Sequence, residues 1–259
     1  MSETQITAGI SSRTATLLYG VVCYTIFFLT FLYAIGFVGN LVVPKTIDGP
    51  ATMTTISALL VDLALLGIFA IQHSVMARPG FKKWWTRIVP TPVERSTYVL
   101  FSSIALLALF VFWQPLGGVI WSVEHPIGVA ALYTGFAFGW GLVLVATFLI
   151  NHFDLFGLRQ VWLYFRKRPY TTLRFVTPWP YRVVRHPLYL GWLFAFWCTP
   201  TMTATHLVFA IMTTAYILIA IQLEERDLAD SHDDYAAYKR RVPMIIPHPV
   251  RSRRNKAVA

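Results

Sequence analysis

The chain has 259 residues, of which 56% are hydrophobic and only 13% charged, and its mean hydropathy is +0.56. This composition excludes an ordinary water-soluble globule, in which about a quarter of the residues are charged. The formal net charge is +10, but the Lys and Arg residues gather in short connections between apolar runs. Loops of a membrane protein explain that distribution better than nucleic-acid binding, which we do not expect.

Six apolar runs follow one another, separated by Pro, Gly or charged clusters. The first four are long enough to cross a hydrocarbon core of about 30 Å as helices. The fifth spans only about 18 Å and is ended by Pro200, so it either adds a sixth crossing or forms a shallow hairpin with the last run. The sequence therefore predicts an all-α polytopic membrane helix bundle with five or six transmembrane helices. The runs cover residues 17–39, 55–75, 97–113, 127–150, 188–199 and 206–223.

Basic residues cluster after the second, fourth and last runs, whereas the other connections carry almost no charge. The positive-inside rule makes the basic connections cytoplasmic, so both termini are expected in the cytoplasm, as in a multi-pass protein of the bacterial inner membrane. The basic tail at 251–256 is expected to be disordered or bound to anionic lipid. Residues 1–150 should hold about four membrane helices, and residues 151–259 the cytoplasmic loop, hairpin and tail that carry the chemistry.

The connection from Asn151 to Arg185 is long for a membrane protein and rich in aromatic residues, which favours a functional loop. It ends at Arg185-His186-Pro187, directly before the fifth run. Proline suits the first helical position, and the free amides of a helix start favour an anion such as a carboxylate. Arg182 or Arg185 would add bidentate contacts. The alternative is that the arginines reach lipid headgroups and His186 caps the helix.

A second polar cluster, Glu224-Glu225-Arg226-Asp227, closes the last run and is followed by Tyr235 to Tyr238. Carboxylates at the end of a membrane helix indicate a cationic partner. That partner is either the ammonium group of a ligand or an arginine of the protein itself. A solvated helix end with salt bridges is the alternative to a binding site.

Together, these two clusters resemble the C-terminal half of the integral-membrane methyltransferases that include isoprenylcysteine carboxyl methyltransferases and phospholipid methyltransferases. The resemblance covers about residues 150–248. Within this family, Gln72-His73-Ser74 and the run from Asn151 to Trp162 look most like the methanethiol S-methyltransferases, which make dimethyl sulfide. The resemblance implies S-adenosylmethionine as methyl donor and a small thiol as acceptor. We expect no metal site, because Cys23 and Cys198 both lie inside apolar runs.

The resemblance also implies how the donor is held. His186 and the backbone around Pro187 would bind it, and Glu224 or Glu225 would accept its ammonium group. The full set of expected cofactor-binding residues is Tyr181, Arg182, Arg185, His186, Pro187, Tyr189, Glu224 and Glu225.

Methyl transfer to a thiol also needs a group that takes the thiol proton, since the thiolate is the nucleophile. His73 and His152 are the candidates, because both lie at the expected cytoplasmic ends of their runs and histidine has a suitable pKa. Tyr181 is the alternative. The substrate pocket is expected to include Asn151, Phe153, Gln160 and Trp192.

Other functions remain open at this stage. A larger lipid-soluble acceptor would use the same chemistry in a wider pocket. His73 and His152 would serve as axial ligands if the chain were a haem or denitrification accessory protein, since related proteins of that kind also carry a Gln-His-Ser motif. A transporter is disfavoured, because the sequence has no internal repeat. The oligomeric state is not predicted.

Overall fold

The computed structural model describes residues 9–173, 176–231 and 234–247, and within them the chain is almost entirely helical. Five helices are long and apolar enough to cross a membrane: α2 (Ile10–Gly39), α3 (Thr55–Ala77), α5 (Thr91–Phe112), α6 (Pro126–Ile150) and α10 (Ala204–Ser231). The shorter helices are α4 (Pro79–Trp85), α7 (His152–Leu155), α8 (Leu158–Phe165), α9 (Pro187–Trp197) and α11 (Tyr235–Arg241). The predicted all-α polytopic bundle is confirmed. The basic tail at 251–256 lies outside the described residues.

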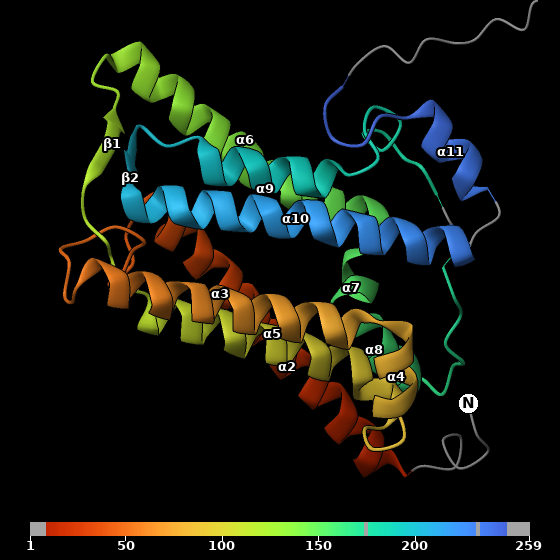
Figure 1. Ribbon diagram of the computed structural model, residues 1–259. Helices are drawn as coiled ribbons and strands as arrows, with labels where there is room; N and C mark the ends of the chain where they lie inside the picture. Colours follow the sequence, from red (N-terminus) through yellow and green to blue (C-terminus); the bar gives the residue numbers. More distant parts are fainter. Residues whose placement is uncertain (1–8, 174–175, 232–233, 248–259) are drawn as a thin grey trace, which may run out of the picture.

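The helices form two groups (Figure 1). α2, α3 and α5 pack together in one group, and α6, α9 and α10 form the other. A core that includes Phe37, Trp113, Trp140, Phe209 and Ile221 joins them. At one end, which we call the strand end, β1 (Val119–Ser122) pairs antiparallel with β2 (Thr201–Thr203). The opposite end, which we call the α11 end, carries α4, α8 and α11 (Figure 1).

The fifth apolar run forms the short helix α9. Pro187 begins this helix, as its missing N–H group predicts, and the helix ends at Trp197, three residues before Pro200. At 1.5 Å per residue it is about 16 Å long, which is too short to cross a hydrocarbon core. α9 leads through β2 directly into α10, so the two helices form a hairpin, but α10 is itself long enough to cross a membrane and the hairpin is therefore not shallow.

Glycines hold α9 close against α6. A Cβ atom on Gly139 would lie 2.5 Å from the backbone nitrogen of Ala195, and one on Gly191 would lie 2.7 Å from the carbonyl oxygen of Gly139. A Cβ atom on Gly135 would meet the Cys198 sulfur at 2.8 Å. Small residues four apart allow membrane helices to pack backbone against backbone. This contact holds α9, whose first residues belong to the candidate site, against α6.

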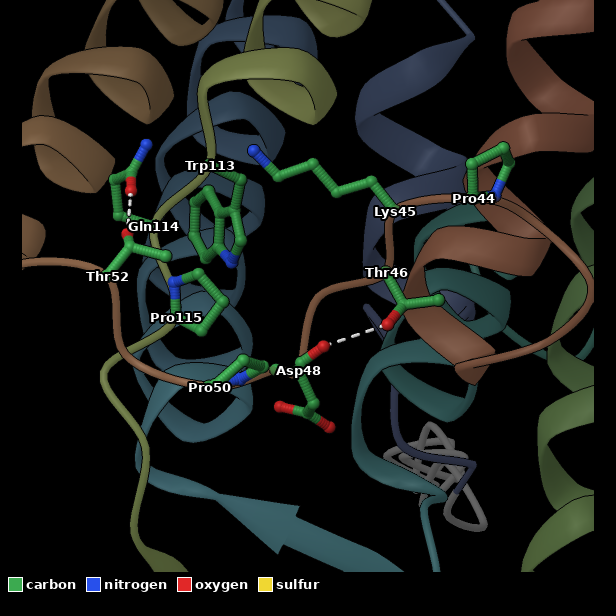
Figure 2. Close-up of a pocket in the computed structure, with 10 residues that line it drawn as sticks. Pro44, Lys45, Thr46, Asp48, Pro50, Thr52, Trp113, Gln114 and Pro115 are labelled. Atoms are coloured by element: carbon green, nitrogen blue, oxygen red, sulfur yellow. Dashed lines mark hydrogen bonds between the residues drawn. The ribbon is translucent and has the colours of Figure 1, made fainter.

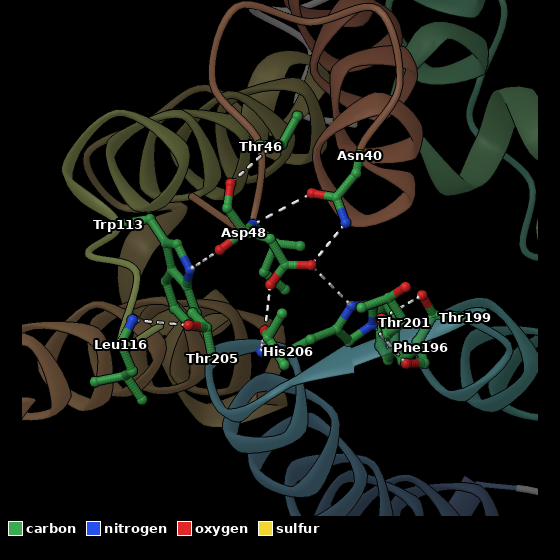
Figure 3. A network of polar contacts seen from close by, with 12 residues as sticks. Asn40, Thr46, Asp48, Trp113, Leu116, Phe196, Thr199, Thr201, Thr205 and His206 are labelled. Atoms are coloured by element: carbon green, nitrogen blue, oxygen red, sulfur yellow. Dashed lines mark hydrogen bonds and ion pairs between the residues drawn. The ribbon is translucent and has the colours of Figure 1, made fainter. Parts of the chain in front are cut away.

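A buried polar network closes the strand end (Figure 3). The Asp48 carboxylate accepts hydrogen bonds from the Asn40 amide at 2.7 Å and from the Thr203 hydroxyl, and it lies 3.9 Å from Nδ1 of His206. His206 is only 1% exposed, and its Nε2 bonds the carbonyl oxygen of Phe196 at 2.9 Å. The network ties the connection after α2 to β2 and to the first turn of α10.

We predict that this network makes stability depend on pH. Burial by itself would raise the pKa of Asp48, but the nearby His206 and the hydrogen bonds from Thr203 and Asn40 outweigh that effect and lower it. The Asp48 contribution is therefore present above the ordinary pKa of about 3.9 and is lost as the pH falls through the lower folded value. At pH 7 in detergent, we expect Asp48→Asn to lower the free energy of unfolding by about 1 to 3 kcal/mol. The melting temperature should fall accordingly.

The control is Glu124→Gln at the same end, where the side chain is exposed. Thermal unfolding followed by circular dichroism between pH 3 and pH 7 checks the prediction. If Asp48→Asn loses as much stability as the unchanged protein over that range, Asp48 is not the group responsible.

Candidate functional site

The α11 end contains a carboxylate that three basic side chains surround. Glu225, on α10, is only 3% exposed. Its Oε1 accepts from Nε of Arg185 at 2.7 Å and lies 3.0 Å from Nε2 of His186, and its Oε2 lies 2.7 Å from Nζ of Lys239. Arg185 and His186 directly precede α9, and Lys239 lies on α11. Glu225 thus joins the start of α9 to the end of α10 and to α11.

The chain after α11 completes this arrangement through its backbone. The N–H groups of Arg185 and His186 donate to the carbonyl oxygens of Pro243 at 2.8 Å and Met244 at 3.1 Å. Nη1 of Arg185 also donates to Val242, at 2.5 Å. An arginine with this many bonds has no freedom to follow a ligand, so we interpret Arg185 as part of the frame of the site.

Glu224 has a different environment from its neighbour. Its side chain is 44% exposed, and its Oε2 lies 3.9 Å from Nδ1 of His186. It also interacts with the hydroxyl group of Tyr189, one turn into α9. The first-turn amides of α9 have no side-chain cap from the part of the chain that the structure describes. An accessible carboxylate and a helix start with free amides therefore lie at the same place, an arrangement that suits a zwitterion.

His73 lies where α3, α5 and α10 meet. Its Nδ1 lies 3.2 Å from the Ser102 hydroxyl, and the Tyr98 hydroxyl lies 3.1 Å from each ring nitrogen. The next residue, Ser74, bonds the hydroxyl group of Tyr216 on α10 at 3.0 Å. Polar side chains in membrane helices are costly and tend to be functional. Sequence reasoning missed Tyr98 and Tyr216, although a tyrosine inside an apolar run is a weak signal of this kind.

His152 begins α7 and is 3% exposed. Its Nδ1 lies 2.8 Å from the Thr147 hydroxyl, its Nε2 lies 2.8 Å from the Tyr24 hydroxyl, and its ring stacks on Phe148 at 4.2 Å. Burial lowers the pKa of His152, which keeps the ring neutral at pH 7. Among the described contacts, no hydrogen bond or ring contact joins the two histidines.

Two expected cofactor-binding residues flank the cluster around Glu225. The carbonyl oxygen of Tyr181 accepts a hydrogen bond from the Tyr238 hydroxyl at 2.6 Å. The hydroxyl group of Tyr181 donates to the carbonyl oxygen of Ala146 at 3.4 Å. Burial raises the pKa of Tyr181, so its hydroxyl group is a hydrogen-bond donor and a poor base. Arg182 is exposed and donates to the carbonyl oxygen of Thr177 at 3.0 Å, so this bond is made within the loop and not to Glu225.

The expected substrate-pocket residues fall into two places. Asn151 connects α6 to α7 with a φ of 137°, and its side chain caps α7 by accepting the Asp154 N–H at 3.2 Å. Gln160 also bonds Asp154, at its carbonyl oxygen, and Phe153 is half-exposed beside them. Trp192 instead packs in the core, edge to face against Trp140 at 5.0 Å.

A pocket of about 240 Å³ lies at the strand end, lined by Lys45, Asp48, Trp113 and Gln114 among others (Figure 2). His206 marks the strand end of α10 and Glu225 its other end, so the rise of the helix separates them by roughly 28 Å. The pocket is therefore remote from the histidines and carboxylates of the candidate site. Within the described ranges, no group of three or more His, Cys, Asp or Glu could hold a metal ion.

Comparison with known proteins gives extensive matches. The chain is 59% identical over 237 residues to a methanethiol S-methyltransferase of Crocosphaera subtropica, covering 91% of this chain and 93% of that protein. It is 54% identical over 240 residues to the protein of the same name from Mycobacterium tuberculosis, covering 92% and 98%. Nurim of Xenopus laevis is 30% identical over 181 residues, covering 65% of this chain and 62% of Nurim. No protein-family model matches the chain, and no solved structure matches it.

Proposed function

The chain belongs to the methanethiol S-methyltransferase family, and from that premise we propose that it transfers a methyl group from S-adenosylmethionine to methanethiol. The products are dimethyl sulfide and S-adenosylhomocysteine. A new bond forms between the thiol sulfur and the methyl carbon as the bond to the sulfonium sulfur breaks, and the thiol proton leaves to a base. The observation that carries this proposal is the 59% identity to a methanethiol S-methyltransferase over 91% of the chain.

Residues at the α11 end suit the amino-acid part of the donor. Three basic side chains already engage Glu225, whereas Glu224 is 44% exposed. We therefore assign the ammonium group of S-adenosylmethionine to Glu224 and its carboxylate to the first-turn amides of α9. Tyr189 and His186 flank Glu224 and would keep its side chain in place. When bound, S-adenosylmethionine supplies an electrophilic methyl group on a positively charged sulfur.

The α11 end suits the cytoplasmic side of the bacterial inner membrane. Arg78, Lys82, Lys83 and Arg87 lie in and around α4 at this end, and the positive-inside rule assigns such connections to the cytoplasm. A charged donor would enter there from water, whereas methanethiol is small and apolar enough to arrive through lipid. Both substrates would then meet at the membrane surface.

We predict that Glu224→Gln weakens binding of S-adenosylmethionine by about 10- to 100-fold, because a charge-assisted hydrogen bond contributes about 1.5 to 3 kcal/mol. The melting temperature should stay within about 2 °C of the unchanged protein, since a half-exposed carboxylate contributes little to folding. Isothermal titration calorimetry of the purified protein in detergent measures the affinity. Asp230→Asn, an exposed acid on the same helix, is the control. Equal affinities in both variants would remove Glu224 from the site.

The decisive experiment incubates the purified protein with S-adenosylmethionine and methanethiol and measures dimethyl sulfide in the headspace by gas chromatography. We expect product only when protein and both substrates are present. Binding of S-adenosylmethionine without dimethyl sulfide would replace methanethiol with a larger lipid-soluble acceptor. Folded protein that neither binds the donor nor forms product would overturn the proposal.

A further inference from the structure

Two histidines share one arrangement of partners. In each, Nδ1 lies beside a Ser or Thr hydroxyl, Ser102 for His73 and Thr147 for His152, and a tyrosine hydroxyl contacts the ring. The tyrosine is Tyr98 for His73 and Tyr24 for His152. Because the partners match, the surroundings of each pair must decide which histidine can meet a substrate.

The partners fix the position of the proton on each ring. The Ser102 hydroxyl donates its only proton to the carbonyl oxygen of Tyr98 at 3.1 Å, so it can only accept from Nδ1–H of His73. Thr147 likewise donates to Leu144 at 2.7 Å and accepts from Nδ1–H of His152. In both neutral rings, Nε2 is therefore the unprotonated nitrogen, assigned from the hydrogen bonds, and it can accept from the tyrosine hydroxyl.

The two tyrosines face different surroundings. Tyr24 lies among aromatic rings, with Phe27, Phe28 and Phe153 within 6.4 Å of its ring centre. Tyr98 instead lies near two other tyrosines, Tyr216 on α10 and Tyr189 on α9.

Tyr189 in turn contacts Glu224. Ser74, next to His73, bonds Tyr216 as well. The pair of His73 and Tyr98 is thus connected by polar side chains to the proposed donor site. His152, by contrast, contacts Tyr24, Thr147 and phenylalanines.

We propose that His73 is the base for methyl transfer and that Tyr98 is its positioning residue; this inference rests on the proposed function. Tyr98 donates to Nε2 of His73 until a thiol S–H takes its place there, and its hydroxyl group then donates to the thiol sulfur. As the new carbon–sulfur bond forms, the thiol proton passes to Nε2. Ser102 holds Nδ1–H of the resulting imidazolium, which afterwards releases one proton to water. Dimethyl sulfide leaves uncharged.

A matched pair of variants tests the role of Tyr98. Tyr98→Phe and Tyr24→Phe each remove one hydroxyl group from one histidine and leave the ring in place. We expect Tyr98→Phe to lower kcat for dimethyl sulfide formation by about 10- to 100-fold and Tyr24→Phe to change it by less than about threefold, since positioned proton transfer contributes about 10²- to 10⁴-fold. The dissociation constant for S-adenosylmethionine should be the same in both. Equal losses of kcat would overturn the assignment of Tyr98.

A second measurement separates a base from a merely structural histidine. Methaneselenol has nearly the size of methanethiol but is ionised at neutral pH, so it needs no base. His73→Ala should lose about 100-fold or more in kcat with methanethiol and less than about tenfold with methaneselenol. An equal loss with both acceptors would overturn the role of His73. Should His73→Ala not fold, Ser102→Ala is the alternative, because it removes the hydrogen-bond partner of Nδ1. Its kcat should also fall more with methanethiol than with methaneselenol, by a smaller factor.

These outcomes distinguish the two proposals. If the unchanged protein forms dimethyl sulfide but Tyr98→Phe and Tyr24→Phe lose the same share of kcat, only the inference about His73 and Tyr98 fails. If the unchanged protein forms no dimethyl sulfide, the proposed function fails and this inference falls with it.

Discussion

Gly139→Leu is expected to abolish both the docking of α9 on α6 and the binding of S-adenosylmethionine. A Cβ atom at this position would lie 2.5 Å from the backbone nitrogen of Ala195 and 2.7 Å from the carbonyl oxygen of Gly191. Backbone atoms cannot turn away as a flexible side chain can, so the two helices must separate. We expect a loss of at least about 3 kcal/mol, at the upper end of the cost of overpacking.

Gly141→Leu is a close control, because it lies on the same helix and a Cβ atom there meets nothing within 4 Å. Thermal unfolding, gel filtration in detergent and donor titration compare the two variants. Gly141→Leu should melt and bind like the unchanged protein, since its new side chain faces open space. A Gly139→Leu protein that keeps its melting temperature and donor affinity would show that α9 does not need this contact.

Glu225→Ala is expected to remove donor binding and to lower the free energy of unfolding by about 3 to 5 kcal/mol. Removing one partner of a buried ion pair leaves the other charges buried and uncompensated. Here the charge left behind is that of Arg185, whose side chain is 9% exposed, and His186, which is 5% exposed, also loses its hydrogen-bond partner. Without the carboxylate, the start of α9 loses its link to α10 and α11.

Lys239→Ala removes the third partner of Glu225 and is the informative comparison. The Lys239 side chain is 49% exposed, so its loss should cost less than about 1 kcal/mol. Chemical and thermal unfolding in detergent, together with calorimetric titration of S-adenosylmethionine, measure both variants. If Glu225→Ala and Lys239→Ala are equally stable, the buried carboxylate does not organise this end of the protein.

Much of the fold could be predicted from hydropathy alone. Four long spans and a short fifth apolar helix were expected, and Pro187 marks the start of that helix. The helix ends were less accurate. The last run was expected to end at residue 223, yet α10 continues to Ser231, and the first was expected to begin at 17, whereas α2 begins at Ile10. Hydropathy indicates the part of a helix that lies in lipid, and polar residues continue both helices beyond it.

The candidate site was harder to predict, because its contacts join residues far apart in the chain. The sequence could not distinguish Glu224 from Glu225; the difference depends on Lys239 and Arg185, which reach only Glu225. Tyr98 and Tyr216 were missed, since an isolated tyrosine in an apolar run resembles a packing residue. The expected roles of His73 and His152 stay predictions until the variants are measured.

The backbone pairing of Arg185 and His186 with Pro243 and Met244 has a consequence for biosynthesis. The ribosome completes α9 long before it reaches these carbonyl partners, and Glu225 is made before Lys239. The membrane helices can therefore be inserted before the proposed donor site has its last backbone contacts. We expect a nascent chain stopped near residue 231 to sit in the bilayer yet bind no donor, and its unpaired charges should mark it for membrane proteases.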